Sequence, residues 1–218
     1  MPIPRAAVFD LDGTLLDTLD DLADSANEAL TTAGLPAHPV DAYRTFVGEG
    51  IHTLVQRILP AGQDDEEMVT RVLALYRAAY GRRWNNKTKP YDGIPESLDA
   101  LLSRQVKLAV LSNKPQKFTD LCMAHHLPDH AFEIVLGQRD SVPRKPDPAG
   151  ALEIAHAFQL DPGEVIFIGD TKTDMDTATA AGMRAIGVSW GFRPVEELRR
   201  HGAEVVVDHP AELLDLFA

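Results

Sequence analysis

Short apolar runs separated by helical patterns constrain the fold of this chain more than any other feature of its sequence. Four strong runs are AAVFD (6–10), VKLAVLS (106–112), EVIFIGD (164–170) and RAIGVS (184–189). Two weaker runs, FEIVLG (132–137) and AEVVVD (203–208), extend this set. Near-continuous apolar strands that alternate with helices form parallel sheets covered on both faces. The pattern therefore predicts an α/β fold with a doubly wound parallel sheet.

Helical patterns supply the crossovers that such a sheet needs, because parallel strands cannot be joined by tight turns. They are PESLDALLSR (95–104), PQKFTDLCMAHH (115–126), DPAGALEIAHAF (147–158), KTDMDTATAAG (172–182), PVEELRRHG (194–202) and PAELLDLF (210–217).

One interval is far longer than a crossover. About 95 residues separate the first two stronger runs, whereas a crossover needs roughly a dozen. The interval carries helical periodicity and little strand pattern, as in TLDDLADSANEALTTAG and EEMVTRVLALYRAAYGRRW. We therefore expect an inserted α-helical domain over residues 16–90 and a core made of residues 1–15 and 91–218.

Two aspartates, Asp10 and Asp12, end the first run and are followed at once by Gly13 and Thr14. Ionised carboxylates repel one another and resist burial, so crowding them at a strand end does not help folding. Asp and Gly also favour turns. This stretch alone thus permits two interpretations, a polar turn or a cation site with a carboxylate nucleophile.

Polar side chains also follow later strands, and ligands of open parallel sheets bind at the carboxyl ends of strands. These side chains are Ser112, Asn113, Lys145, Asp170 and Asp174. Each has an ordinary explanation: Ser112 as a turn hydroxyl, Lys145 as a surface lysine, Asp170 as a helix cap and Asp174 as an exposed helix charge. Their occurrence together at successive strand ends favours one common site.

Carboxylates and a lysine at one edge are suited to a divalent cation and a phosphate. Mg²⁺ prefers hard oxygen ligands. We predict that Asp10 and Asp170 bind Mg²⁺ through their side chains, Asp12 through its backbone carbonyl, and Asp174 directly or through water.

The segments DLDGT, LSNK, RKPDP and GDTKTD, in that order, resemble the four motifs of the haloacid dehalogenase superfamily. The resemblance covers the whole chain and implies a Rossmann-like core, a mobile helical cap and a Mg²⁺-dependent aspartyl-phosphate mechanism. In that mechanism Asp10 is the nucleophile, and Asp12 protonates the leaving oxygen and then activates water. Ser112 and Asn113 hold the phosphate, and Lys145 offsets its charge.

Within this superfamily, an aspartate at position 12 argues against a dehalogenase, because a departing halide needs no proton. The stretch YRTFVGEGIHTLVQRIL (43–59) resembles the cap of phosphoglycolate phosphatases. That similarity implies that Val47, Gly48, Glu49 and Gly50 help to choose the substrate; the alternative is a flexible connector. A sugar phosphomutase, a pyrophosphatase or another metabolite phosphatase stays open, as does a non-catalytic regulator that binds a phosphometabolite.

Composition limits the partners of the chain. A formal net charge of −12 argues against binding to nucleic acid, which requires a basic face. The one cysteine excludes an internal disulfide, and no apolar run resembles a signal peptide or a membrane span. We therefore expect a cytoplasmic protein, a monomer or homodimer, that acts on a small phosphorylated metabolite.

Overall fold

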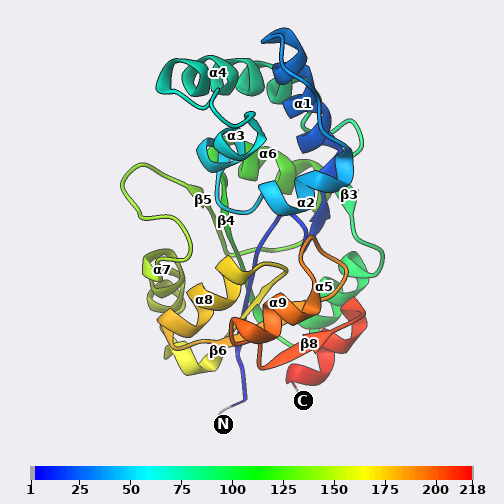
Figure 1. Ribbon diagram of the computed structural model, residues 1–218. Helices are drawn as coiled ribbons and strands as arrows, with labels where there is room; N and C mark the ends of the chain where they lie inside the picture. The colour runs from blue at the N-terminus through cyan, green and yellow to red at the C-terminus, as the bar shows by residue number, and fades with distance from the viewer. Residues whose placement is uncertain (1–2, 218) are drawn as a thin grey trace. The chain divides into compact units, whose positions relative to one another are not determined.

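The computed structural model describes residues 3–217, which divide into two compact units. The core unit comprises the chain up to Leu16 and from Pro90 onward, and the helical unit comprises Asp17–Lys89. Two short paired strands, β2 (Leu16–Asp17) and β3 (Lys89–Pro90), connect the units (Figure 1). The helical unit thus interrupts the core unit between the first two strands of its main sheet.

Six parallel strands form that sheet, which confirms the predicted α/β fold class. Their spatial order is β5-β4-β1-β6-β7-β8. Their bounds are β1 (Ala6–Phe9), β4 (Lys107–Pro115), β5 (Ile134–Gln138), β6 (Val165–Gly169), β7 (Arg184–Val188) and β8 (Val205–Val207). The chain winds away from β1 in both directions, which places the topological switch point of the sheet beside β1.

The central strand β1 is completely buried, as its uninterrupted apolar sequence predicts. Ala6 and Val8 belong to a cluster that includes residues of α7 and α8. The alternate residues Ala7 and Phe9 point to the opposite face and have no exposed surface either. Burial on both faces leaves the carboxyl end of β1 as the place where this strand meets polar groups.

Helices of the core unit form where the sequence predicts them, and only the segment 210–217 differs from the predicted helix type. They are α5 (Ile94–Ser103), α6 (Gln116–His126), α7 (Ala149–Phe158), α8 (Lys172–Ala181), α9 (Val195–Arg200) and the short 3₁₀ helix η2 (Pro162–Glu164). Residues 210–217 form a 3₁₀ helix, η3 (Pro210–Phe217), rather than an α-helix. Apolar spacing identifies the buried Leu213 and Phe217 correctly, but it does not fix the hydrogen-bond pattern of so short a segment.

The helical unit contains four α-helices and one 3₁₀ helix among its residues. They are α1 (Leu19–Thr32), η1 (Val40–Ala42), α2 (Tyr43–Phe46), α3 (Ile51–Ile58) and α4 (Glu66–Arg83). Glu28 on α1 forms ion pairs with Arg82 and Arg83 on α4, the latter at 2.7 Å. None of the helices in the described part of the chain has the length and apolar character needed to cross a membrane.

Candidate active site

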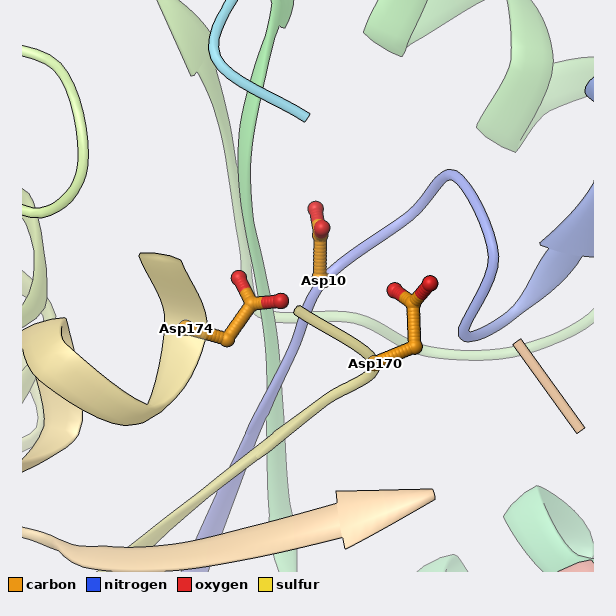
Figure 2. A group of neighbouring side chains, drawn as sticks. All are labelled: Asp10, Asp170 and Asp174. Carbon is orange, nitrogen blue, oxygen red and sulfur yellow. The ribbon is translucent and has the colours of Figure 1, made fainter. Parts of the chain in front are cut away.

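Three buried aspartates from three segments of the core unit converge at the carboxyl edge of the sheet. Asp10 directly follows β1, Asp170 directly follows β6, and Asp174 lies in the first turn of α8. One carboxylate oxygen of each lies within 4.8 Å of the others, and Figure 2 shows the three side chains gathered around one space. We refer to these residues as the aspartate cluster. Its position follows from the pairing of β1 with β6 at the switch point of the sheet.

Gly13 allows the chain to turn tightly after β1. Its φ is +86°, in the left-handed region that residues with a Cβ atom adopt only at a cost. A Cβ atom at this position would also lie 2.3 Å from Oδ2 of Asp170. The turn is closed by hydrogen bonds from the Gly13 N–H to the Leu16 carbonyl and from the Leu15 N–H to the Leu11 carbonyl. Glycine therefore lets the turn pack directly against the Asp170 carboxylate.

Hydrogen bonds hold both carboxylate oxygens of Asp170. The Thr14 hydroxyl donates to Oδ1 at 3.0 Å, and the backbone N–H of Phe192 donates to Oδ2 at 2.8 Å. Thr171, rather than Asp170, is the N-cap residue of α8. The alternative that Asp170 is only a helix cap is therefore wrong, and its carboxylate is a fully buried member of the cluster.

Asp174 is fully buried, so the alternative of an exposed helix charge is wrong as well. Its Oδ2 accepts hydrogen bonds from the backbone N–H and the hydroxyl of Thr171, at 3.0 and 2.7 Å. Its Oδ1 accepts a hydrogen bond from Nζ of Lys145 at 2.6 Å. This capping box at the start of α8 fixes the Asp174 carboxylate toward the cluster.

Lys145 bridges two members of the cluster. Its Nζ lies 3.0 Å from Oδ1 of Asp10 and 2.6 Å from Oδ1 of Asp174. Only 2% of its side-chain surface is exposed, so the alternative of a surface lysine is wrong. A buried ammonium is costly unless it is paired, and Lys145 has two carboxylate partners.

The end of β4 supplies three more polar residues, all buried. The Asn113 side chain forms two 3.0 Å hydrogen bonds with the backbone of Lys145, one to its carbonyl and one from its N–H. Asn113 thus positions Lys145, and its predicted contact with phosphate stays a prediction. The Ser112 hydroxyl accepts a 3.3 Å hydrogen bond from the Lys114 N–H, and its phosphate contact also stays a prediction.

Asp12 points its carboxylate toward Lys114. Nζ of Lys114 donates to both carboxylate oxygens, at 2.7 and 2.9 Å. Lys114 directly follows Ser112 and Asn113, but the polar pattern after this strand does not distinguish it as a site residue. Residue order at a strand end indicates which polar groups are near the site, but not which of them pair with each other. The proposed metal contact of Asp12 through its backbone carbonyl stays a prediction.

Burial and charge shift the pKa values of the cluster. Burial is the main reason that the pKa of Asp10 rises to about 7; Lys145 opposes this rise, and the carboxylates of Asp174 and Asp12 add to it. Burial, followed by the charges of Asp174 and Asp10, raises the pKa of Asp170 well above its ordinary value. Burial lowers the pKa of Lys145, but the carboxylates of Asp10 and Asp174 raise it overall. The site thus favours additional positive charge.

The charge and the donor atoms of this site fit a hard divalent cation. The site contains the ammonium groups of two lysines and the carboxylates of four aspartates: Lys114, Lys145, Asp10, Asp12, Asp170 and Asp174. With all six groups ionised, their formal charge is −2, which one divalent cation would neutralise. Carboxylate oxygens are the ligands that Mg²⁺ prefers. The residues present are therefore suitable for holding this ion.

The four predicted substrate-selecting residues lie in the helical unit, in the segment between α2 and α3. Gly48 and Gly50 have φ values of +109° and +88°, so the segment needs glycine at both positions. Nη2 of Arg57 lies 2.7 Å from Oε1 of Glu49. This ion pair offsets the negative charge of Glu49. The role of Val47–Gly50 in substrate choice stays a prediction.

Comparisons with known proteins agree with these features. The sequence model of one family, described as haloacid dehalogenase-like hydrolase, matches residues 7–188. The chain is 31% identical to a phosphoglycolate phosphatase of Pseudomonas putida, over 98% of this chain and 77% of that protein. It is 34% identical to a phosphoglycolate phosphatase of Nitrosospira multiformis, over 94% and 92%.

A solved structure extends the similarity to three dimensions. A crystal structure of a predicted phosphoglycolate phosphatase from Haemophilus somnus superimposes with a TM-score of 0.91 at 28% identity, over the full length of both chains.

Proposed function

Because the chain belongs to the haloacid dehalogenase-like hydrolase family, we propose that it is a Mg²⁺-dependent phosphatase that hydrolyses phosphoglycolate through an aspartyl-phosphate on Asp10. The observation that carries this proposal is the aspartate cluster with Lys145 bridging Asp10 and Asp174. A buried carboxylate beside an ammonium group and two further carboxylates is suited to nucleophilic attack on a phosphate near a cation.

Two successive displacements would complete the reaction. In the first, an oxygen of Asp10 attacks phosphorus, the bond from phosphorus to the leaving oxygen breaks, and Asp12, which must enter this step protonated, gives that oxygen its proton. In the second, Asp12 takes a proton from water, whose oxygen attacks the same phosphorus and releases Asp10 and inorganic phosphate. Each cycle returns both aspartates to their starting states.

The other site residues would stabilise the phosphate during both displacements. Side-chain oxygens of Asp10, Asp170 and Asp174 and the backbone carbonyl of Asp12 would hold Mg²⁺, with Asp174 acting directly or through water. When bound, this ion supplies charge stabilisation to the transferring phosphate. Lys145 adds a second positive charge, Ser112 donates a hydrogen bond, and Asn113 keeps Lys145 in place.

Phosphoglycolate is the proposed substrate because both compared relatives are named phosphoglycolate phosphatases. Each of them aligns with nearly the full length of this chain. The test is a panel of phosphoglycolate, sugar phosphates, nucleotides and pyrophosphate, with kcat/KM measured for each. We expect the largest kcat/KM for phosphoglycolate. A preference for another ester would overturn this substrate, and binding without turnover of any of them would indicate a regulator.

Metal removal should abolish activity and also lower stability. Mg²⁺ at about 100 times its Kd stabilises the folded state by roughly 2.7 kcal/mol, and each kcal/mol shifts Tm by about 2–4 °C in a chain of this size. We therefore expect chelation to lower Tm measurably and readdition of Mg²⁺ to restore it.

Ca²⁺ should inhibit the enzyme, because its larger and more flexible ligand shell displaces the nucleophilic oxygen from the line of attack. Full activity after exhaustive chelation would contradict the proposed site.

Changes in Val47–Gly50 should alter the choice of substrate. We expect Glu49→Ala and Gly50→Ala to change the ratio of kcat/KM between phosphoglycolate and p-nitrophenyl phosphate by roughly 10-fold, the effect of losing a specific contact. Gly62→Ala is the matched control, because Gly62 also has a positive φ and a Cβ atom on it would meet open space. A parallel response of both substrates would make the segment a connector.

A further inference from the structure

Lys114 is a buried lysine to which the proposed mechanism gives no role. Its side chain is 3% exposed, and its Nζ donates to both oxygens of Asp12, whose side chain is 20% exposed. It lies near the end of β4, within the stretch between Leu111 and Pro115 over which the pairing register with β5 shifts. The strand therefore delivers an ammonium group to the carboxylate that is proposed to transfer protons.

We propose that Lys114 is a positioning residue that fixes the orientation of the Asp12 carboxylate, an inference that rests on the proposed function. Asp12 is separated from Asp10 by only one residue, yet its carboxylate is not a member of the aspartate cluster. The nearby Asp10 carboxylate repels it, and its partial exposure leaves it room to rotate toward solvent. A single ammonium that contacts both oxygens fixes the direction of the carboxylate plane.

Orientation matters here because proton transfer depends steeply on geometry. A displacement of about 1 Å can lower a rate by roughly 10²-fold. A buried ion pair is weak evidence for a purely stabilising role, because replacing both partners by apolar groups is often neutral, although removing one partner alone is destabilising. If Lys114 acts only through Asp12, its removal should slow the steps in which Asp12 moves a proton and spare the others.

Two substrates with different leaving groups distinguish the steps that need proton transfer by Asp12 from those that do not. Phosphoglycolate loses a poor leaving group that needs a proton, whereas p-nitrophenyl phosphate loses a stable anion that needs little help. We expect Lys114→Met to lower kcat/KM by roughly 10- to 100-fold for phosphoglycolate and by only a few-fold for p-nitrophenyl phosphate. Lys114→Arg, which keeps the charge and the donors, should restore part of the loss. Equal losses for both substrates would overturn the proposal.

A double-mutant cycle tests whether Lys114 acts through Asp12. In the Asp12→Asn background, Lys114→Met should cause little further loss of kcat/KM for phosphoglycolate; independent, multiplicative losses would overturn the proposal. Lys107→Met is the matched control, because Lys107 lies on the same strand and forms a long, half-exposed ion pair with Glu133. Thermal melts identify any variant that fails to fold.

A structural readout keeps this inference separate from the proposed function. If the wild-type protein hydrolyses none of the tested esters, the proposed function fails. Crystal structures of the wild type and of Lys114→Met then decide the positioning role alone. A changed orientation of the Asp12 side chain supports the role, and an unchanged orientation overturns it.

Discussion

The Asp10→Asn protein should fold normally and show no measurable phosphate turnover. The amide keeps the shape of the side chain, and its oxygen can still accept the hydrogen bond that Asp10 accepts from the Leu11 N–H. It has no carboxylate to attack phosphorus, and it is a poorer metal ligand. Removal of the nucleophile lowers kcat by about 10⁶-fold in a well-studied protease, and we expect a loss of comparable size.

Stability should not fall in the same variant. Asp10 is a buried carboxylate whose pKa is raised to about 7, chiefly by burial, so neutralising it removes an unfavourable charge. Lys145 keeps its 2.6 Å partner Asp174. Tm without metal should therefore stay equal or rise, while the increase in Tm caused by Mg²⁺ should shrink.

Asp176→Asn is the control for this substitution. Asp176 lies on α8 near the cluster but is 43% exposed and pairs with His201. It should keep wild-type kcat and KM for phosphoglycolate. Substantial turnover by a homogeneous, folded Asp10→Asn protein would remove Asp10 from its proposed role.

The fold class could be predicted because the apolar patterns of strands and helices are visible in the amino-acid sequence. Each of the six apolar runs forms a strand of the sheet. The inner strands β1 and β6 are buried on both faces and must therefore be apolar almost throughout. The segment 210–217 shows the limit of this reasoning. Its apolar spacing predicts the buried face correctly but not the 3₁₀ hydrogen bonding of η3.

The sequence predicts which residues belong to the site better than it predicts which of them contact each other. The sequence places Asp10 and Asp170 at strand ends, but only the strand order brings β1 and β6 side by side. Asn113 binds the backbone of Lys145 from 32 positions away, a contact that no local pattern encodes. Lys114 was missed for the same reason, because its partner Asp12 lies on another strand end.

Asp12→Asn should separate the two halves of the reaction. The leaving group of p-nitrophenyl phosphate needs little proton donation, so Asp10 should still be phosphorylated and nitrophenolate released. Water then has no general base, and the aspartyl-phosphate should accumulate. We expect a burst of nitrophenolate equal to the amount of enzyme, followed by a steady rate about 10²- to 10⁴-fold below that of the wild type. Phosphoglycolate, which needs the acid as well, should show no burst.

Metal binding and folding should survive this change. The proposed metal contact of Asp12 is its backbone carbonyl, which the substitution keeps, so the increase in Tm caused by Mg²⁺ should resemble that of the wild type. The asparagine oxygen can still accept one hydrogen bond from Lys114, in place of the two that Asp12 accepts. Asp12→Glu serves as the comparison, because it keeps a carboxylate but moves it away from the position that Lys114 fixes. A wild-type steady rate together with weakened Mg²⁺ binding in Asp12→Asn would make Asp12 a side-chain metal ligand instead of the acid and base.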